Sequence, residues 1–455
     1  MSTLAIEIND AGLVVADAND VRAVEPGYAV VERERILTGT EAQRHARLKP
    51  RATSNRFWSS LSLEPGSAGV DGVRNAAELA YAQLSDLWRR FASPGDEAIL
   101  VVPGYYRPEQ LGLLLGLAQE CGMPVRAMVD AAVAASARPY PGRQLLYLDS
   151  GLHRVSATPL QQGEEVLAQG EQGLAAAGLA SVLESLARRA AEVFVLATRF
   201  DPFHRAEAEQ LLYDRLPGWL ARLHAEEEVE LDLPHEDGEL RVRLQRAQWL
   251  GAAQGFYRAV AQLVAQSREP GRALVLQLSD RLATLPGLVG ELARLDDTHI
   301  ETLPPGHAAR AVLAAELPPP PGAGQVKLLK RLPWRGAPVA LPAAPERPVE
   351  SARAEERPTH VVYRGVAYRV GQDGIVVGRA PVDGRRTIVV DDQAGGVSRE
   401  HCEIVLRNGE LMLYDLSRYG TFINEKKVPG EAALRRGDVI RVGSPGAHLQ
   451  AVIVE

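Results

Sequence analysis

Arginine and hydroxyl side chains near the end of this chain have types and spacing that suit recognition of a phosphate group. Arg379 follows a glycine, Ser398 begins a Ser-Arg-Glu-His run, and Arg418 lies in a Leu-Ser-Arg-Tyr-Gly-Thr run. A phosphate monoester offers negative charge and three acceptor oxygens, so guanidinium and hydroxyl donors on neighbouring loops are the groups that hold it. The three residues therefore predict a site for one phosphate group.

The elements that must position these residues are predicted to be short strands. The run HCEIVLRNGELMLYDL places Asn408-Gly409 between two alternating apolar segments, which is the strongest short-range signal for a β-hairpin. Further turns are expected at Gly420, Pro429-Gly430 and Gly437-Asp438. Closely spaced strands with glycine-rich turns predict an all-β sandwich over residues 357–455.

Residues 375–443 resemble the forkhead-associated (FHA) family, whose members bind phosphothreonine. The motifs that carry the resemblance stand in family order: Gly378-Arg379, then Ser398-Arg399-Glu400-His401, then the run from Asp415 to Asn424. The resemblance implies that Arg379 and Ser398 contact the phosphate, and that Arg418 adds a third contact. It further implies that Asn424 and Tyr419 belong to the phosphothreonine-binding site, where Asn424 holds the peptide or loop backbone. Structural roles are implied for Gly378, His401, Gly420 and Thr421.

Two residues depart from the commonest pattern of that family. Tyr419 stands where many members have Asn, and Glu425 follows Asn424 where Gly is usual. An alternative is therefore a domain kept as a phosphate-independent interaction surface. The presence of both Arg379 and Ser398 favours phosphothreonine binding.

The first 317 residues alternate strand and helix patterns, which predicts an α/β domain. Leu4–Ile8 and Leu13–Asp17 flank a short turn and predict a hairpin, while 98–103, 144–150 and 274–278 predict buried strands. A helix is expected from Pro108, which suits a first turn, to a C-terminal cap at Gly122. Further helical periodicity covers 175–197 and 204–224.

Two segments in this region resemble the ATPase domain of DnaK-type heat shock protein 70 chaperones, a member of the actin-like superfamily. They are LTGTEAQRHARLKPRATSNRF and ILVVPGYYRPEQLGLLLGLAQECGMPVRAMVDAAVAAS. The resemblance implies two lobes around a nucleotide cleft. It also implies that the remnants of that site are Glu7, Asp130, Asp149 and Gly151.

The nucleotide motifs themselves are degenerate. The first phosphate turn carries Asp10, and the second has Leu152 and His153 where that family needs glycines for close approach of backbone amides. The catalytic lysine of the family falls near Ser60, and the glycine pair that packs on adenosine is replaced by Leu278-Ser279-Asp280. We expect a pseudo-ATPase. ATP with Mg²⁺ stays open as a cofactor, and no catalytic residue or metal ligand is assigned.

A proline-rich segment, residues 318–356, is expected to link the two domains. It holds nine of the 30 prolines, which favour an extended conformation over a packed element. Its apolar patch from Gln325 to Trp334 is either a solvated part of the linker or a docking segment.

Charge and cysteine content limit the class of protein. Residues 357–455 carry 14 Lys and Arg against 12 Asp and Glu, a charge of +2. Because the whole chain has a net charge of −7, the rest of the chain carries −9. This balance is too weak for a nucleic-acid surface but suits one anionic group. Two cysteines far apart, the absence of an N-terminal leader and the absence of a long apolar stretch predict a cytoplasmic protein without membrane contact.

The sequence thus predicts a cytoplasmic adaptor that binds a phosphothreonine-containing protein and so belongs to a Ser/Thr kinase pathway. Two alternatives stay open. The first is an active or weakly active chaperone-like ATPase that its FHA domain recruits to phosphorylated clients. The second is a structural protein that polymerises, as some actin-like proteins do.

Overall fold

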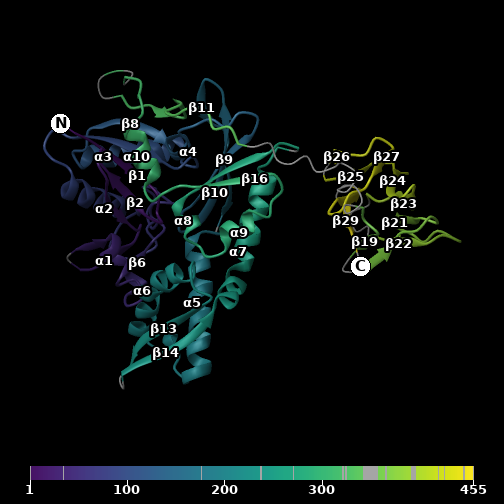
Figure 1. Ribbon diagram of the computed structural model, residues 1–455, viewed down its shortest axis with the longest axis horizontal. Helices are drawn as coiled ribbons and strands as arrows, with labels where there is room; N and C mark the ends of the chain where they lie inside the picture. The colour runs from purple at the N-terminus through teal and green to yellow at the C-terminus, as the bar shows by residue number, and fades with distance from the viewer. Residues whose placement is uncertain are drawn as a thin grey trace. The chain divides into compact units, whose positions relative to one another are not determined.

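A computed structural model gives the structure of this chain. It describes residues 2–33, 35–175, 177–235, 238–269, 271–319, 322, 325–341, 357–363, 366–390, 396–418, 420–424, 426–443 and 446–453. The chain forms two compact units, Met1–Pro342 and Ala343–Glu455. Unit 1 carries the α/β elements and unit 2 consists of strands, so the chain is a multidomain protein with a C-terminal all-β sandwich (Figure 1).

Unit 1 contains two large sheets, and the first is built outward from an N-terminal hairpin. In order across the sheet, the strands are β17 (Leu328–Leu329), β8 (Val125–Asp130), β7 (Glu97–Val102), β1 (Thr3–Glu7), β2 (Leu13–Ala16) and β3 (Val21–Glu25). The predicted hairpin is confirmed, since β1 pairs antiparallel with β2 and sets Ile6 opposite Val15. Strand β7 continues the sheet in parallel on the other side of β1.

The second sheet repeats this pattern. In order, the strands are β16 (Thr298–Thr302), β15 (Leu274–Leu278), β9 (Gln144–Ser150), β10 (Arg154–Gln162), β11 (Glu165–Ala168) and β18 (Arg331–Pro333), with β12 (Gln172–Ala175) also paired to β10. Strands β9, β10 and β11 are antiparallel neighbours, and β15 and β16 follow β9 in parallel. Each sheet therefore has a hairpin, a third antiparallel strand and two parallel strands in the same order.

Helices cover the first sheet and complete what we call lobe 1. They are α1 (Gly39–Gln43), η1 (Pro50–Ala52), α2 (Ala76–Phe91), α3 (Pro108–Glu120), α4 (Ala131–Ala135) and α10 (His307–Leu313), beside a small sheet of β4 (Ala29–Val31), β5 (Ile36–Thr38) and β6 (Thr53–Ser54). The helix predicted to begin at Pro108 is confirmed, and Gly122 has the positive φ of 66° that ends it. Leu114 and Ala118 bury its apolar face.

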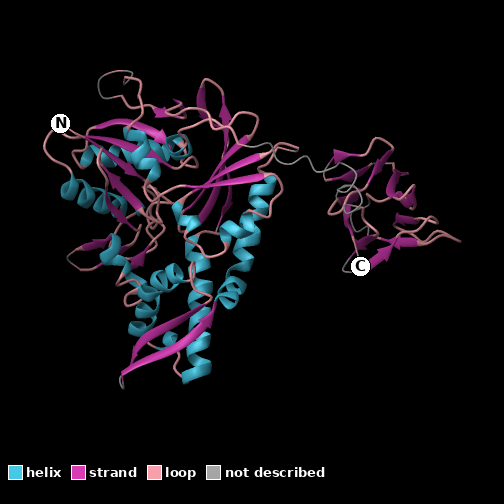
Figure 2. Ribbon diagram, viewed as in Figure 1, coloured by secondary structure: helices cyan, strands magenta, loops and turns pink. Residues whose placement is uncertain are grey.

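Lobe 2 surrounds the second sheet and has a larger helical core. Its elements are α5 (Leu179–Thr198), η2 (Pro202–His204), α6 (Ala206–Arg222), α7 (Arg246–Gln266), α8 (Asp280–Ala283), α9 (Leu288–Leu292) and the hairpin β13 (Glu228–His235) with β14 (Gly238–Gln245). Figure 2 shows the hairpin in magenta beside the long cyan helices. Phe194, Trp219 and Trp249 are buried between these elements.

The apolar patch of the proline-rich segment is part of unit 1, which corrects the expected boundary of the linker at residue 318. Leu328–Leu329 add a parallel strand to β8 in lobe 1, and Arg331–Pro333 pair with β11 in lobe 2. Leu332 is only 1% exposed, so burial of apolar surface holds the segment in place. The indole of Trp334 donates a hydrogen bond to the Gly163 carbonyl (3.0 Å). We call residues 325–341 the strap, because it joins both lobes.

Unit 2 is a sandwich of two sheets whose strand pairs are mostly antiparallel. One contains β20 (Val366–Arg369), β19 (His360–Tyr363), β29 (Gly446–Val452), β28 (Val439–Gly443), β25 (Thr421–Ile423) and β26 (Lys426–Lys427); the other contains β22 (Thr387–Val389), β21 (Ile375–Gly378), β23 (Cys402–Arg407), β24 (Glu410–Asp415) and β27 (Glu431–Ala433). Ile404, Leu413 and Ile440 lie in the core between them. The predicted hairpin is confirmed, since Asn408 and Gly409 both have positive φ between β23 and β24.

Within the described residues, no helix combines the length and apolar character needed to cross a membrane.

Candidate functional site

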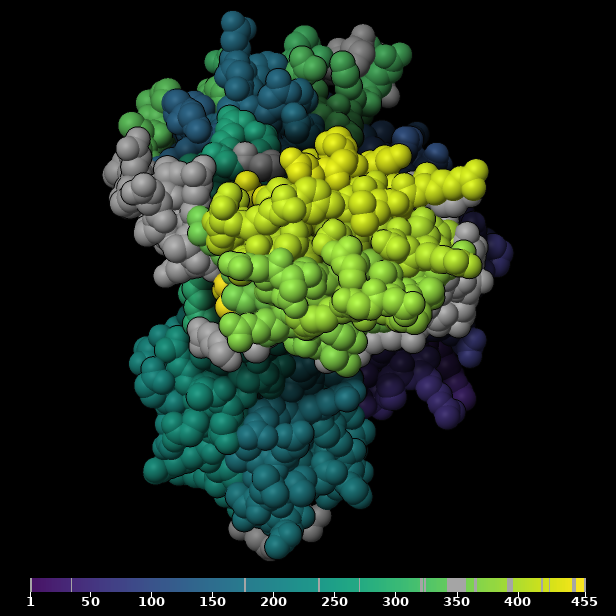
Figure 3. Space-filling view, turned by 90° about the vertical axis from the view of Figure 1, so that its right-hand side faces the viewer, coloured from purple at the N-terminus to yellow at the C-terminus, as the bar shows by residue number. Residues whose placement is uncertain are grey.

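The candidate phosphate site of unit 2 is built on loops that follow β21, precede β23 and precede β25. The surface of this unit is coloured from green to yellow in Figure 3. Gly378 ends the buried strand β21, and a Cβ at this position would lie 1.8 Å from the carbonyl oxygen of Arg399. Only glycine permits that approach. The sequence motif Gly378-Arg379 therefore has a packing reason for its first residue.

Backbone contacts bring the three candidate phosphate ligands to one place. The amide of Arg379 donates to the carbonyl of Ser398 (3.1 Å), and the amide of Arg418 donates to the Ser398 hydroxyl (3.3 Å). The side chains of Arg379 and Arg418 are exposed, and Ser398 is half-buried between them in the loop network. No described residue forms a hydrogen bond or ion pair with the Arg379 guanidinium. The site thus presents cationic side chains to solvent around one hydroxyl.

His401 lies beneath these loops and is fully buried. Its Nδ1 accepts a hydrogen bond from the Ser398 amide (3.0 Å), which leaves Nε2 to donate to the Gly420 carbonyl (3.2 Å). Both nitrogens are therefore used when the ring is neutral. The imidazole joins the loop before β23 to the loop before β25.

The loop before β25 is organised by Asp415. Its Oδ1 accepts from the Ser417 hydroxyl (2.7 Å), the Ser417 amide (3.1 Å) and the buried Thr421 hydroxyl (2.8 Å). Burial opposes the charge of Asp415, but these hydrogen bonds outweigh burial and hold the pKa of the carboxyl below its usual range. Gly420 follows with φ of 99°, a conformation that favours glycine. The loop that carries Arg418 is therefore fixed from below.

Of the last two predicted binding residues, Asn424 and Tyr419, the structure describes Asn424. Asn424 has φ of 48°, donates to Asp438 Oδ1 (2.8 Å) and accepts from the Val439 amide (3.0 Å). Its side chain thus holds a neighbouring loop of the domain. Tyr419 and Glu425 lie outside the described residues.

In unit 1 the predicted nucleotide-site remnants Glu7 and Asp149 come together across the two lobes, around a residue that the sequence interpretation did not single out. The guanidinium of Arg281, in α8 of lobe 2, lies 2.8 Å from Glu7 and 3.4 Å from Asp149. It also donates to the carbonyl oxygen of Gly12 (3.1 Å). In the sequence, Arg281 stands three residues after the strand Leu274–Leu278 and next to Asp280, and this position alone gives no signal for a contact with the first hairpin.

Electrostatics keep this arginine charged. Burial opposes the charge, but Glu7, Asp149 and Asp280 outweigh burial and hold the pKa of Arg281 well above its usual range. Burial in turn raises the pKa of Glu7, against the opposing effect of Arg281. The cluster is therefore rich in carboxylates that share one cation.

The turn of the first hairpin contacts the turn of the second hairpin directly. Asp10 Oδ1 accepts from the Leu152 amide (2.7 Å), and Asn9 donates to Asp149 Oδ2 (3.0 Å). A Cβ on Gly151 would lie 2.3 Å from Asp10 Oδ1, so Gly151 leaves the space that the Asp10 carboxylate fills. Burial raises the pKa of Asp10 to about 6, against the opposing hydrogen bond from Leu152.

The remaining nucleotide-motif residues lie apart from the Arg281 guanidinium cluster. Asp130 caps α4, where its Oδ1 accepts from the amides of Ala132 (3.0 Å) and Val133 (3.4 Å). The Ser60 hydroxyl donates to the Arg56 carbonyl (2.7 Å). Among the described residues, no group of three or more His, Cys, Asp or Glu side chains is arranged to hold a metal ion.

These contacts do not fit an ATP–Mg²⁺ complex. The space between Glu7 and Asp149 contains the Arg281 guanidinium, and the amide of Leu152 already has Asp10 as its acceptor. A metal ion and a phosphate would have to displace both side chains.

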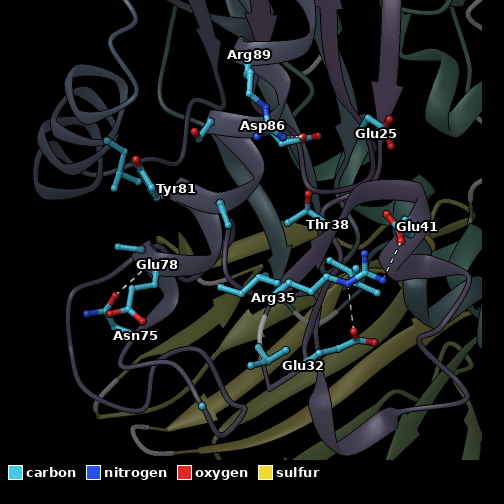
Figure 4. A pocket seen from close by; sticks show the side chains of 18 of the residues that line it. Glu25, Glu32, Arg35, Thr38, Glu41, Asn75, Glu78, Tyr81, Asp86 and Arg89 are labelled. Atoms are coloured by element: carbon cyan, nitrogen blue, oxygen red, sulfur yellow. Dashed lines mark hydrogen bonds and ion pairs between the residues drawn. The ribbon is translucent and has the colours of Figure 1, made fainter.

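A cavity of about 1320 Å³ lies in lobe 1 between β4, β5 and α2. Figure 4 shows that many of its side chains are charged, with Arg35 directed toward Glu32 and Glu41. On the α2 wall, Arg89 pairs with Asp86 (2.8 Å). The charges on its walls thus neutralise one another locally, and the cavity gives no basis for assigning a catalytic group.

Comparison with known protein families gives one match. Residues 375–443 match the FHA domain family, and this range lies entirely within unit 2. It includes Arg379, Ser398, His401 and Arg418. No curated protein matches the chain.

Proposed function

We propose that this protein is a phosphothreonine-dependent adaptor, in which unit 2 binds a phosphorylated partner protein and unit 1 is a chaperone-like pseudo-ATPase that acts as a scaffold. An FHA domain implies phosphothreonine-dependent protein interaction. The observation that carries the proposal is the convergence of Arg379, Ser398 and Arg418 on adjacent loops above a buried His401.

The proposed contacts follow from the chemistry of the three side chains. The exposed Arg379 guanidinium pairs with two phosphate oxygens at once, and the Ser398 hydroxyl donates to a phosphate oxygen. Arg418 adds positive charge from the next loop. Asn424 contributes indirectly, because its side chain holds the loop at Asp438 and Val439. A partner phosphorylated on threonine implies a Ser/Thr kinase upstream.

The proposal for unit 1 is supported by its topology. Two sheets with the same strand order, each based on a hairpin, are what a two-lobed actin-like ATPase fold requires. The degenerate turns and the Arg281 cluster favour loss of hydrolysis. The rival function is a chaperone-like ATPase that unit 2 recruits to phosphorylated clients. Phosphate release by the wild type, compared with a Glu7→Ala/Asp149→Ala variant, discriminates between them.

Calorimetry with the full-length protein and a degenerate phosphothreonine peptide library tests the binding proposal. Hydrogen bonds to charged groups contribute about 1.5–3 kcal/mol, so Arg379→Ala should weaken binding by about tenfold to over a hundredfold. Ser398→Ala should weaken binding less. The same peptides without phosphate, or with glutamate, should not bind, because a carboxylate has less charge and one oxygen fewer.

Arg369→Ala is the matched control for this experiment. Arg369 is an exposed arginine on β20, in the sheet that does not contain β21. It should bind the phosphopeptides as the wild type does. Equal affinity of wild type and Arg379→Ala, or an equal loss in Arg369→Ala, would refute the proposed site.

A further inference from the structure

The contact between the two hairpin turns of unit 1 contains one charged side chain of the same sign as each part of a metal–phosphate ligand. Arg281 is a cation held among carboxylates, which is the surrounding that a divalent cation prefers. Asp10 is a carboxylate that accepts from the amide of a tight turn, which is the donor that a phosphate oxygen prefers. The two side chains come from different lobes.

We propose that Asp10 and Arg281 are a built-in substitute for a bound metal–phosphate group and hold the two lobes of unit 1 closed without a nucleotide. We call the set Glu7, Asn9, Asp10, Asp149 and Arg281 the interlobe clasp. It rests on the proposal that unit 1 is a pseudo-ATPase and specifies how its two lobes are held.

Three kinds of contact in the clasp join lobe 1 to lobe 2: those of Arg281, of Asp10 and of Asn9. Arg281 reaches from α8 to Glu7 and to the Gly12 carbonyl, so its charge bridges both lobes. Asp10 reaches in the opposite direction, from the first turn to the Leu152 amide. Each lobe thus contributes one charged side chain that contacts the other lobe, and separation of the lobes would break both interactions.

Burial makes these contacts costly to break. Glu7 and Asp10 are each 2% exposed, and the Arg281 side chain is 10% exposed. An opened cleft would leave a guanidinium and several carboxylates without partners, and the loss of one member of a buried ion pair is strongly destabilising. Water molecules can replace the lost partners only if the lobes separate far enough for every charged group to be hydrated. The closed arrangement is therefore the resting state of unit 1.

Asn9 adds a neutral contact to the same interface. Its amide donates to Asp149 Oδ2 (3.0 Å) and to the Ser150 carbonyl (3.3 Å), while its Oδ1 accepts from the Ala11 amide (2.9 Å). The side chain is thus satisfied on both ends by the protein. A cavity of about 830 Å³ is lined by residues of both lobes, among them Arg56 and His153, but by none of the five clasp residues.

Hydrogen exchange on the full-length protein tests the clasp. In the wild type, segments 9–13 and 149–153 should exchange slowly, and saturating Mg-ATP should leave their rates unchanged. Asp10→Ala removes the acceptor of the Leu152 amide, and exchange there should rise by about 10-fold to 150-fold, as expected for loss of a hydrogen bond to a charged group. Arg281→Met should raise exchange in both segments.

Arg215→Met is the matched control. Arg215 forms an ion pair with Asp232 (3.3 Å), and both residues belong to lobe 2, on α6 and β13 rather than in either hairpin turn of the clasp. Exchange in the two turns should remain at the wild-type rate in this variant. If Arg281→Met does not fold, Arg281→Lys keeps the charge with a single donor group and should give an intermediate rate.

Slower exchange of the turns in wild type with Mg-ATP would overturn the clasp, and so would equal acceleration by Arg215→Met and Arg281→Met. Unchanged exchange in Asp10→Ala would also overturn it. Phosphate release is measured separately, and ATP turnover by the wild type would refute the pseudo-ATPase proposal. The hydrogen-exchange rates test the clasp independently of that result.

Discussion

Replacement of His401 by alanine should destabilise unit 2 strongly, although the residue lies beneath the candidate phosphate site rather than in it. The ring is 0% exposed and is the partner of the Ser398 amide and the Gly420 carbonyl. Alanine leaves a buried donor and a buried acceptor unpaired. Each such group costs about 1–3 kcal/mol, so the free energy of unfolding should fall by about 2–6 kcal/mol.

That loss is large for a unit of this size. Domains of about 60–100 residues lose roughly 4–8 °C in Tm for each kcal/mol, so the transition of unit 2 should move down by roughly 10 °C or more. Because Ser398 and Arg418 are joined to the same loops, phosphopeptide affinity should also fall as the loops loosen. Arg379→Ala, in contrast, should lower affinity with little change in Tm, because its guanidinium is exposed.

The two units can be followed separately in the intact chain. All five tryptophans, at positions 58, 88, 219, 249 and 334, belong to unit 1. Tryptophan fluorescence therefore reports unfolding of unit 1, and a calorimetric transition without a fluorescence change reports unit 2. His448→Ala in β29 is the control, since His448 is exposed and its loss should change stability by less than about 0.5 kcal/mol. A Tm of His401→Ala equal to that of His448→Ala would refute this reasoning.

Two further predictions concern unit 1. Leu332→Ala in the strap should lower the free energy of unfolding of unit 1 by about 2–5 kcal/mol, because Leu332 is 1% exposed. Tryptophan fluorescence measures this change, and Leu63→Ala, at an exposed leucine, should have little effect. Equal effects of the two substitutions would contradict the packing of the strap. Burial raises the pKa of Glu171 to about 7, above its unfolded value of 4.5, so the folded state holds a proton that the unfolded state releases. The stability of unit 1 should therefore fall as pH rises from about 5 to 8, by up to about 1.4 kcal/mol for each unit of pKa shift. Urea titrations at several pH values measure this slope, and Glu171→Gln should flatten it; an unchanged slope would show that Glu171 is not its source.

Local interactions made several elements predictable. The turn at Asn408-Gly409 requires two residues that tolerate positive φ, and the sequence has them between two alternating apolar runs. Pro108 and Gly122 likewise begin and end α3 through their own backbone preferences. The motifs of the FHA match are short, and each one can be recognised in the sequence without knowledge of the rest of the chain.

The strap shows where local composition misled. Proline content predicted a solvated linker from residue 318, yet Leu328, Leu329 and Leu332 are partly or fully buried on two sheets. Their strands are only two and three residues long, too short for a periodic signal. Their conformation is fixed by the exposed edges of β8 and β11, which exist only after both lobes have folded.

The sequence by itself determined the class of unit 2, whose residues 375–443 match the FHA domain family, and it predicted the residues of the candidate phosphate site and degenerate nucleotide motifs in unit 1. Only the tertiary structure decided which side chains meet between the two hairpin turns of unit 1. Arg281 lies far along the chain from Glu7 and Asp149, and the Asp10 carboxylate meets an amide 142 residues away. No propensity or spacing encodes such a meeting, because it depends on how two separately folded sheets bring their hairpin turns together.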